Sequence, residues 1–349
     1  MAERLRVTAL TGGAQVPSAR FRVGQLAPAL AACGVDLDIR HARVSSYAPE
    51  SRLQRPLWLA ATLAARLPDI AATRHSRVTL MQREFVSTMA TIEGLTARPR
   101  VLDVDDAIWL NRGDGGFARR LARQVDVVVA GNRYLAEWFG THGRRVEVLP
   151  TSIDTARFRP GSAAGAWAGG AARVIGWTGM AANFSYLAAW EEPVRAVLAA
   201  EPDVILRVCA DRRPSLDRLP AGRWEWVPWS PEVEVPFLQA LDIGLMPLAD
   251  TPWARGKCSF KMLQYLACGV PAVVSPVGMN CEVLAQGDVG LGAADPDAAA
   301  AAMLALLADP DRRARMGQAG RDVVTTYYAV DVVAPRLAAI LRDVAAGYY

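Results

Sequence analysis

The chain has 349 residues, of which 52% are hydrophobic and 21% charged, and its formal net charge is +4. This length favours about two domains, and the composition excludes a disordered chain. No stretch approaches the roughly 18 consecutive apolar residues of a membrane-spanning helix. The N-terminus lacks the apolar core of a signal peptide. We therefore expect a cytoplasmic protein.

The charge is unevenly distributed along the chain. Residues 1–150 hold 21 basic and 14 acidic residues, whereas the remainder holds 18 basic and 21 acidic residues. A positive first half could face a membrane surface or an acidic partner, although such an imbalance is also ordinary surface composition. Nucleic acid is not an expected partner, because no binding motif with interleaved aromatic residues is present.

The cysteine and histidine residues do not have the spacing of a metal centre. The five cysteines are scattered without a C-x-x-C pair, and we expect them to be reduced thiols, mostly in the core. His41, His75 and His142 match no metal-binding pattern. We expect no structural metal and no resident cofactor.

The first half alternates short apolar strands with helices. The first strand leads through Gly12 and Gly13 into a helix that is expected to continue to about Ala32, and Arg20 and Arg22 near its start are expected to point toward the same crevice. This order predicts a doubly wound α/β domain with a mostly parallel sheet. Strands are expected over residues 5–10, 35–39, 78–81, 101–104, 125–130 and 146–149.

Two helices of this half carry specific expectations. Residues 51–67 are rich in leucine, with arginines on both sides of Trp58. Such a segment is either an interfacial membrane helix or, more commonly, a helix packed on the sheet. A further helix is expected after Gln82–Phe85, and Asn132 is expected to cap a helix that ends near Gly140.

Three aspartates lie at the end of the fourth strand, with Asp103 inside it and Asp105 and Asp106 just after it. Paired carboxylates can bind Mg²⁺, and aspartates are also common in turns and helix caps. The interpretation we favour is that Asp105 and Asp106 lie past the carboxyl end of a strand, where open α/β sheets place groups that contact ligands.

The second half repeats the same order of elements after a linker of small residues, 161–172. We place an N-terminal domain at 1–160, a C-terminal domain at 173–328, and a last helix at 329–349 that could return to the first domain. Strands are expected over residues 174–177, 204–209, 224–229, 242–247, 270–275 and 289–291. Helices are expected over residues 184–199 (capped by Asn183), 232–241, 260–268, 280–285, 296–308, 311–326 and 330–345.

The basic segment between two of these elements is unusual. Of the 39 basic residues, 37 are arginine, and the only lysines are Lys257 and Lys261. Arg255, Lys257 and Ser259 precede the helix expected over 260–268, and Lys261 lies in its first turn. Unpaired N–H groups at a helix N-terminus favour an anion. A compact ammonium suits phosphate oxygens, whereas the alternative is a solvated basic loop.

The segment from 242 to 282, with Met262-Leu-Gln-Tyr-Leu-Ala-Cys-Gly-Val-Pro271 at its centre, resembles the GT-B glycosyltransferases of the bacterial family 4 (group 1) type. The similarity begins near Pro150 and is weaker in the first half. It implies two Rossmann-like domains that face each other across a cleft. The second domain would hold a nucleotide-diphosphate sugar and the first domain an acceptor.

The resemblance also assigns residues. Arg255, Lys257 and Lys261 would neutralise the leaving diphosphate, and Asp105 or Asp106 would orient or deprotonate the acceptor hydroxyl. The donor-binding residues would be Gly12, Gly13, Thr178, Gly179, Val227, Trp229, Ser259, Phe260 and Gln264. The acceptor-side residues would be Arg20, Arg22 and Glu84.

The chain departs from the family pattern in three places. The two family glutamates fall at Gly256 and Gln264, so both carboxylates are missing. The Arg–Lys pair expected after the first strand of the second domain is absent around residues 177–183, and no histidine stands near Asp105. Gln264 can still form a hydrogen bond with a ribose hydroxyl.

From the resemblance we expect a glycosyltransferase that retains anomeric configuration and needs no metal ion. Its acceptor would be a glycan, a polysaccharide precursor or a lipid-linked molecule, with peripheral contact at the inner face of a membrane as one option. The alternatives are a nucleotide-binding scaffold that has lost activity and a sugar-nucleotide epimerase. A nicotinamide dehydrogenase is disfavoured by the lack of a G-x-G-x-x-G motif.

Overall fold

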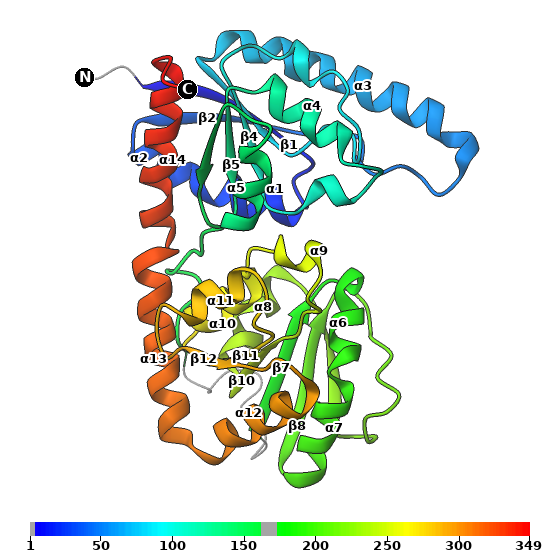
Figure 1. The fold of residues 1–349 in the computed structure, drawn as a ribbon, viewed down its shortest axis with the longest axis vertical. Helices are drawn as coiled ribbons and strands as arrows, with labels where there is room; N and C mark the ends of the chain where they lie inside the picture. Colours follow the sequence, from blue (N-terminus) through cyan, green and yellow to red (C-terminus); the bar gives the residue numbers. More distant parts are fainter. Residues whose placement is uncertain (1–3, 162–172) are drawn as a thin grey trace. The chain divides into compact units, whose positions relative to one another are not determined.

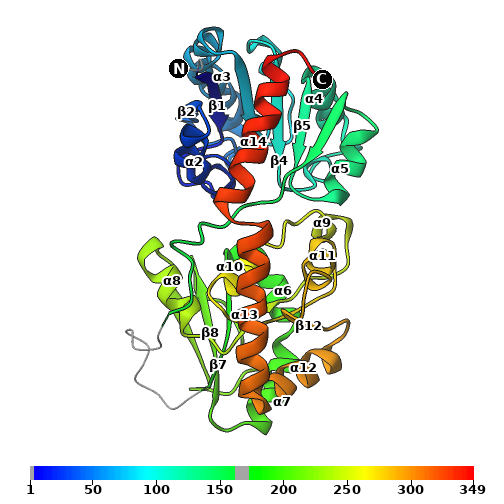
Figure 2. The same cartoon turned by 90° about the vertical axis from the view of Figure 1, so that its left-hand side faces the viewer.

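The computed structural model describes residues 4–161 and 173–349. The expected linker at 161–172 therefore lies, apart from Gly161, outside the described residues. The chain divides into two compact units, each built on a six-stranded parallel sheet (Figures 1 and 2). The first unit contains the chain up to Ser152, Gly256–Cys258 and Val330–Tyr349, and the second contains Ile153–Arg255 and Ser259–Ala329.

The sheet of the first unit has the order β2-β1-β3-β4-β5-β6. Its strands form because short apolar runs are covered on both faces by helices, so that β3 and β5 are buried along their whole length. The strand order reverses between β1 and β3, where the carboxyl ends lead to Gly12 and Arg83. The strands are β1 (Leu5–Thr11), β2 (Val35–His41), β3 (Val78–Gln82), β4 (Arg100–Val104), β5 (Val127–Ala130) and β6 (Arg145–Val148).

Helices cover both faces of this sheet. The last helix of the chain belongs to this unit and lies beside α2 (Figure 2), and it buries Val333, Leu337 and Leu341 in the same core as β1 and β5. The α-helices are α1 (Pro17–Arg22), α2 (Ala27–Ala32), α3 (Arg55–Ala72), α4 (Gly116–Gln124), α5 (Arg133–Gly140) and α14 (Val330–Ala345).

Two expectations for this unit are wrong. The helix expected to run to Ala32 is divided into α1 and α2 by a 3-10 turn at Gly24–Leu26, consistent with the low helix propensity of glycine. The segment after Phe85 forms no α-helix, and residues 83–99 contain a 3-10 turn at Glu93–Leu95 and an isolated β-bridge between Val86 and Met89. Arg83 and Thr88 have φ angles of 64° and 67°, which an α-helix cannot accommodate.

The second unit has the sheet order β12-β11-β10-β7-β8-β9, which reverses between β7 and β10. The strands are β7 (Arg173–Gly179), β8 (Val204–Ala210), β9 (Trp224–Pro228), β10 (Ile243–Met246), β11 (Ala272–Val274) and β12 (Gly290–Gly292). The helices are α6 (Phe184–Ala189), α7 (Glu191–Ala200), α8 (Pro231–Gln239), α9 (Pro252–Arg255), α10 (Phe260–Ala267), α11 (Met279–Leu284), α12 (Pro296–Ala308) and α13 (Pro310–Tyr327). The helix expected over 184–199 is interrupted at Trp190, and Asn183 makes no capping hydrogen bond.

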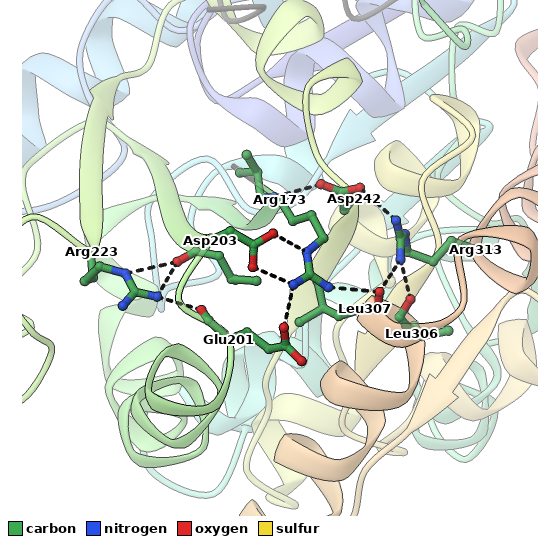
Figure 3. A network of polar contacts seen from close by, with 10 residues as sticks. Arg173, Glu201, Asp203, Arg223, Asp242, Leu306, Leu307 and Arg313 are labelled. Carbon is green, nitrogen blue, oxygen red and sulfur yellow. Dashed lines mark hydrogen bonds and ion pairs between the residues drawn. The ribbon is translucent and has the colours of Figure 1, made fainter. Parts of the chain in front are cut away.

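Charged residues form hydrogen bonds and ion pairs at the amino ends of the strands in this unit (Figure 3). Arg173, the first residue of β7, donates hydrogen bonds to Asp203 at 2.6 and 2.9 Å and to Glu201 at 2.5 Å. Arg313 of α13 pairs with Asp242 at 3.3 Å and donates to the Leu306 carbonyl at 2.6 Å. These groups satisfy one another at the edge opposite the carboxyl ends of the strands.

A buried ion pair joins α1 to β4 in the first unit. Arg22 and Asp103 are 3% and 4% exposed, and Arg22 Nη2 lies 2.5 Å from Asp103 Oδ1. Arg22 Nη1 also donates to the Leu149 carbonyl at 2.7 Å. The guanidinium of Arg22, which was expected on the acceptor side, is therefore bonded to buried groups of the first unit.

We predict that Arg22→Ala lowers the free energy of unfolding by about 3–5 kcal/mol, because it leaves the carboxylate of Asp103 buried without its partner. Urea unfolding at neutral pH measures this loss. Arg20→Ala is the matched control because Arg20 lies on the same helix and is only half-buried. A loss for Arg22→Ala no larger than that for Arg20→Ala would contradict a structural role.

Candidate functional site

The carboxyl ends of β1 and β3 border a small hollow in the first unit. Its volume is about 20 Å³, and it lies where the strand order reverses, the place at which open α/β sheets bind ligands. Gly12 and Glu84, both expected site residues, contribute to its wall. The lining residues are Gly12, Val16, Ser18, Ser46, Tyr47, Gln82, Arg83, Glu84 and Ser87.

Several buried polar atoms near this edge lack a hydrogen-bond partner among the described residues. They are Gln82 Nε2, Glu84 Oε2 and Asp105 Oδ1. Buried polar groups are nearly always hydrogen-bonded in native proteins. Three exceptions at the ends of neighbouring strands indicate a place where a polar ligand would complete the bonding.

Arg83 stands between the carboxylates of this edge. Its Nη1 lies 3.2 Å from Asp106 Oδ2 and its Nε lies 3.9 Å from Glu84 Oε2. The φ angle of 64° places Arg83 in the left-handed region, which costs energy for a side chain other than glycine. Such strain is common at functional sites, and nothing in the sequence pattern singled out this residue.

The acidity of Asp106 is weakened by its surroundings. Burial, followed by the charge of Asp105, raises the pKa of Asp106 to about 6, while Arg83 and Lys257 oppose the shift. A carboxylate with this pKa is mostly ionised at neutral pH and is a stronger base than an ordinary aspartate.

The short segment Gly256–Cys258 is part of the first unit and lies near these aspartates. Asn132 Nδ2 donates to the carbonyls of Gly256 and Lys257, at 3.1 Å in each case. Asn132 was expected only as a helix cap, and its Oδ1 does accept from the Leu135 amide. A Cβ atom at position 256 would lie 2.7 Å from Ala107 Cβ, so no glutamate fits where the family pattern has one.

In the second unit, helix α10 begins at a residue in the left-handed conformation. Ser259 is the N-cap with φ of 50°, and its hydroxyl donates to Asn280 Oδ1 at 2.7 Å instead of capping the helix. Asn280 in turn donates to the Ser275 carbonyl at 2.9 Å. This arrangement fixes the start of α10 beside the end of β11.

Lys261 lies at the carboxyl end of β7. Its Nζ is 4.7 Å from the centre of the Trp177 ring, a cation–π distance. A Cβ atom on Gly179 would lie only 2.6 Å from Lys261 Cε, so a side chain at this position would displace the lysine from its place. Thr178 is adjacent, and its amide donates to the Tyr265 hydroxyl at 3.1 Å. The structure therefore brings Lys261 next to Thr178 and Gly179, from which it is distant in the sequence.

Gln264 faces a carboxylate that the sequence analysis did not identify. Its Nε2 donates to Glu234 Oε1 at 3.0 Å, and Glu234 Oε1 also accepts from Trp229 Nε1 at 3.4 Å. Arg157 Nη2 binds the other oxygen of Glu234 at 2.8 Å. Because Glu234 fixes the amide nitrogen of Gln264, the amide oxygen is the end that remains to accept a hydrogen bond.

The remaining residues that the sequence predicted for the site do not belong to the groups of contacts described above. Arg255 forms two hydrogen bonds with Asp250, at 2.6 and 2.9 Å, on the surface of the second unit, so its charge is already paired. Val227 is buried, Phe260 and Arg20 are half-buried, and Gly13 accepts a turn hydrogen bond from Val16. Within the described ranges no group of three or more His, Cys, Asp or Glu side chains could hold a metal ion.

Similarity to solved structures defines the class of fold. A sucrose-phosphate synthase from Thermosynechococcus elongatus superimposes with a TM-score of 0.75 at 16% identity, over 99% of this chain and all of that one. A glycosyltransferase from Rickettsia africae gives 0.71 at 12% identity, with 99% of both chains covered. HepE from Anabaena, solved with UDP-glucose, gives 0.69 at 11% identity over 97% of this chain and 99% of that one. The fold is the two-domain GT-B fold.

The sequence is similar to a known family over part of its length. Residues 172–309 match the family described as Glycosyl transferases group 1. A curated relative from Corynebacterium glutamicum, a GDP-mannose-dependent monoacylated alpha-(1-6)-phosphatidylinositol monomannoside mannosyltransferase, is 29% identical over 252 residues. That alignment spans 64% of each chain, which is less than two thirds of the relative.

We predict a pH-dependent effect of Asp106→Asn on stability. The pKa of Asp106 is raised in the folded chain, so its protonated form stabilises the fold below about pH 4, and this contribution is lost as the pH rises through about 6. The variant should therefore be more stable than the natural protein by about 2 kcal/mol at pH 8 and show no such gain at pH 4. Urea unfolding at both pH values measures the difference.

Asp114→Asn is the control for this experiment. Asp114 is exposed, and its hydrogen bond with Arg119 lowers its pKa, so that substitution should not stabilise the protein at high pH. Equal stability changes of Asp106→Asn at the two pH values would contradict the raised pKa.

We also predict strong coupling between positions 234 and 264. Gln264→Glu would place a second carboxylate against the buried Glu234, which should lower the free energy of unfolding by about 2 kcal/mol or more. The double variant Glu234→Gln/Gln264→Glu restores one amide and one carboxylate and should recover much of this loss. A double-mutant cycle in urea measures the coupling, with the exposed Glu232→Gln as control. Additive losses would show that the two side chains do not interact.

Proposed function

We propose that this protein transfers a sugar from a nucleotide-diphosphate sugar to an acceptor hydroxyl, with the donor bound by the second unit and the acceptor by the first. This proposal rests on the close approach of Lys261 to Gly179 at the carboxyl end of β7. The unit that contains both residues matches the group 1 glycosyl transferases. The solved structures of HepE with UDP and with UDP-glucose support a nucleotide sugar as the donor class.

On the donor side, the proposed chemistry is charge stabilisation. When the bond between the sugar and the diphosphate breaks, negative charge develops on the leaving phosphate oxygen. The N–H groups at the start of α10 and the ammonium groups of Lys257 and Lys261 would stabilise that charge. This arrangement supports a reaction that does not depend on a metal ion. Arg255 would contribute less than its sequence position implies, because Asp250 already neutralises it.

On the donor side we further propose that Gln264 accepts a hydrogen bond from a ribose hydroxyl through its free amide oxygen. Glu234 and Arg157 support this role because they hold the amide nitrogen in place. Thr178 and Gly179 would border the sugar-phosphate, and Val227 and Trp229 the base. Ser259 would act mainly by fixing the start of α10 through Asn280.

On the acceptor side, Asp105 or Asp106 would orient the attacking hydroxyl or accept its proton as the new bond to the sugar carbon forms. A pKa of about 6 supports Asp106 in the second role at neutral pH. Gly12 and Glu84 would contact the acceptor from the hollow between β1 and β3. Retention of configuration is part of the proposal and rests on the family resemblance.

The acceptor would be a glycan, a polysaccharide precursor or a lipid-linked molecule. The curated relative is named for a phosphatidylinositol mannoside, which supports the lipid-linked class. Such an acceptor would bring the protein to the inner face of a membrane, a location that the exposed side of α3 suits.

The absence of a glutamate at position 256 favours an alternative function, that of a nucleotide-binding scaffold. The family glutamate that falls at Gly256 is absent, and the closeness of Ala107 leaves no room for any side chain there. A nucleotide-binding scaffold without turnover would have the same feature. Binding and turnover must therefore be measured separately.

We predict that UDP, GDP, dTDP, ADP or CMP will raise the melting temperature without added Mg²⁺, and that one of them will do so most strongly. At 100 times its Kd a ligand stabilises the fold by about 2.7 kcal/mol. Lys261→Ala should weaken binding of that nucleotide about tenfold, and binding of the matching nucleoside much less, because a lost phosphate contact affects only the nucleotide.

Arg195→Ala is the control, because Arg195 is a cation of the second unit that pairs with Glu192 on the surface. Equal weakening of nucleotide and nucleoside by Lys261→Ala would exclude a phosphate contact. Nucleotide binding without sugar transfer to any glycan or lipid-linked acceptor would favour the scaffold. No stabilisation by any nucleotide would contradict the proposed donor site.

A further inference from the structure

Helix α3 buries several polar side chains and exposes an apolar face. Its buried residues include Thr62, Arg66 and Asp69. From Leu57 onward its exposed residues are all apolar, and their spacing of three and four places them on one face. These exposed residues are Leu57, Ala60, Ala61, Ala64, Leu67, Pro68 and Ala71.

The inward polar side is held by specific bonds. Arg66 donates to the Thr11 carbonyl at 2.5 Å, lies 3.4 Å from Asp69, and stacks over the Phe85 ring at 5.0 Å. Rotation of the helix to bury its leucines would break these bonds and expose a buried ion pair. The fold therefore keeps the apolar face at the surface, where it spans about 21 Å at 1.5 Å per residue.

Arginines surround this face. Arg52, Arg55 and Arg74 are exposed, and the Arg43 side chain is 58% exposed. The apolar face continues at Leu53, which is 93% exposed. Within residues 43–77 the acidic residues are Glu50 and Asp69, of which Asp69 is buried. We call Leu53, Leu57, Leu67 and the alanines between them, with these four arginines, the α3 surface.

We propose that the α3 surface binds to an anionic lipid bilayer, with the helix lying parallel to the membrane. An apolar face with a basic border is the pattern of helices that enter the headgroup region, where arginines contact lipid phosphates and leucines enter the hydrocarbon edge. A second copy of this chain fits less well, because a symmetric contact would bring arginines of like charge together.

The α3 surface is connected to the hollow of the first unit. Trp58 Nε1 donates to the Ser45 carbonyl at 2.9 Å, and the next two residues, Ser46 and Tyr47, line the hollow. Tyr47 is 56% exposed. Figure 1 shows the amino-terminal part of α3 extending past the sheet. A headgroup at the bilayer surface would thus lie near the proposed acceptor side, although membrane binding itself does not require the transfer reaction.

Sedimentation with vesicles tests this inference on the whole protein. In about 0.1 M NaCl, vesicles with about 30% phosphatidylglycerol in phosphatidylcholine should bind the protein at least tenfold more strongly than pure phosphatidylcholine vesicles. The variant Leu57→Gln/Leu67→Gln should bind about 30-fold more weakly because two apolar side chains are lost from the contact. Arg52→Gln/Arg55→Gln should reduce binding about tenfold and remove most of the preference for anionic lipid.

Leu95→Gln is the matched control, since Leu95 is 59% exposed in the same unit but lies outside α3. It should bind as the natural protein does. Melting temperature and nucleotide affinity, measured for every variant, separate loss of docking from loss of fold or of the donor site. Absence of binding to anionic vesicles, or unchanged binding by the leucine variant, would overturn the inference. So would a dimer that dissociates on Leu57→Gln while vesicle binding is absent.

Discussion

In both units every strand runs parallel to its neighbours, and this single constraint decides where the candidate site can lie. Parallel strands bring all their carboxyl ends to one edge of the sheet. Open α/β sheets bind ligands outside those ends where the strand order reverses, which here is between β1 and β3 and between β7 and β10. Gly12 follows β1 and Arg83 follows β3, and Gly179 is the last residue of β7.

Polar groups at the amino ends of the strands and at the carboxyl ends differ in how well they are hydrogen-bonded. At the amino ends of the second sheet, Arg173, Asp203 and Glu201 satisfy one another. At the carboxyl edge of the first sheet, buried atoms of Gln82 and Glu84 lack hydrogen-bond partners among the described residues, and Arg83 has a strained backbone. Local departures of this kind from an otherwise well-satisfied fold are expected at functional sites.

Helix α3 is a larger departure of the same kind from the usual packing. A helix packed on a sheet normally turns its apolar face inward, whereas α3 also has an apolar face that is exposed, because Arg66 and Asp69 are bonded on its inner side. The cost of an exposed apolar face is acceptable in a protein if a partner covers it. The proposed acceptor side and the membrane contact would then be separate surfaces of the first unit, connected through Trp58.

The sequence by itself determined the alternation of strands and helices, the parallel character of both sheets and the resemblance to the group 1 glycosyl transferases, because these features depend on local periodicity and on motifs of adjacent residues. It also predicted site roles for Lys261, Gln264, Asp105 and Asp106. It missed the interruption at Gly24 and the irregular segment after Phe85, where turn conformations replaced the expected helix.

Only the tertiary structure decided which side chains meet. It paired Arg22 with Asp103, 81 residues away, and Gln264 with Glu234, 30 residues away. It placed Lys261 against Gly179, paired Arg255 with Asp250, and chose which face of α3 is exposed. Periodicity indicates that a helix has two faces, but the direction each face points depends on the packing of distant segments, which no local pattern contains.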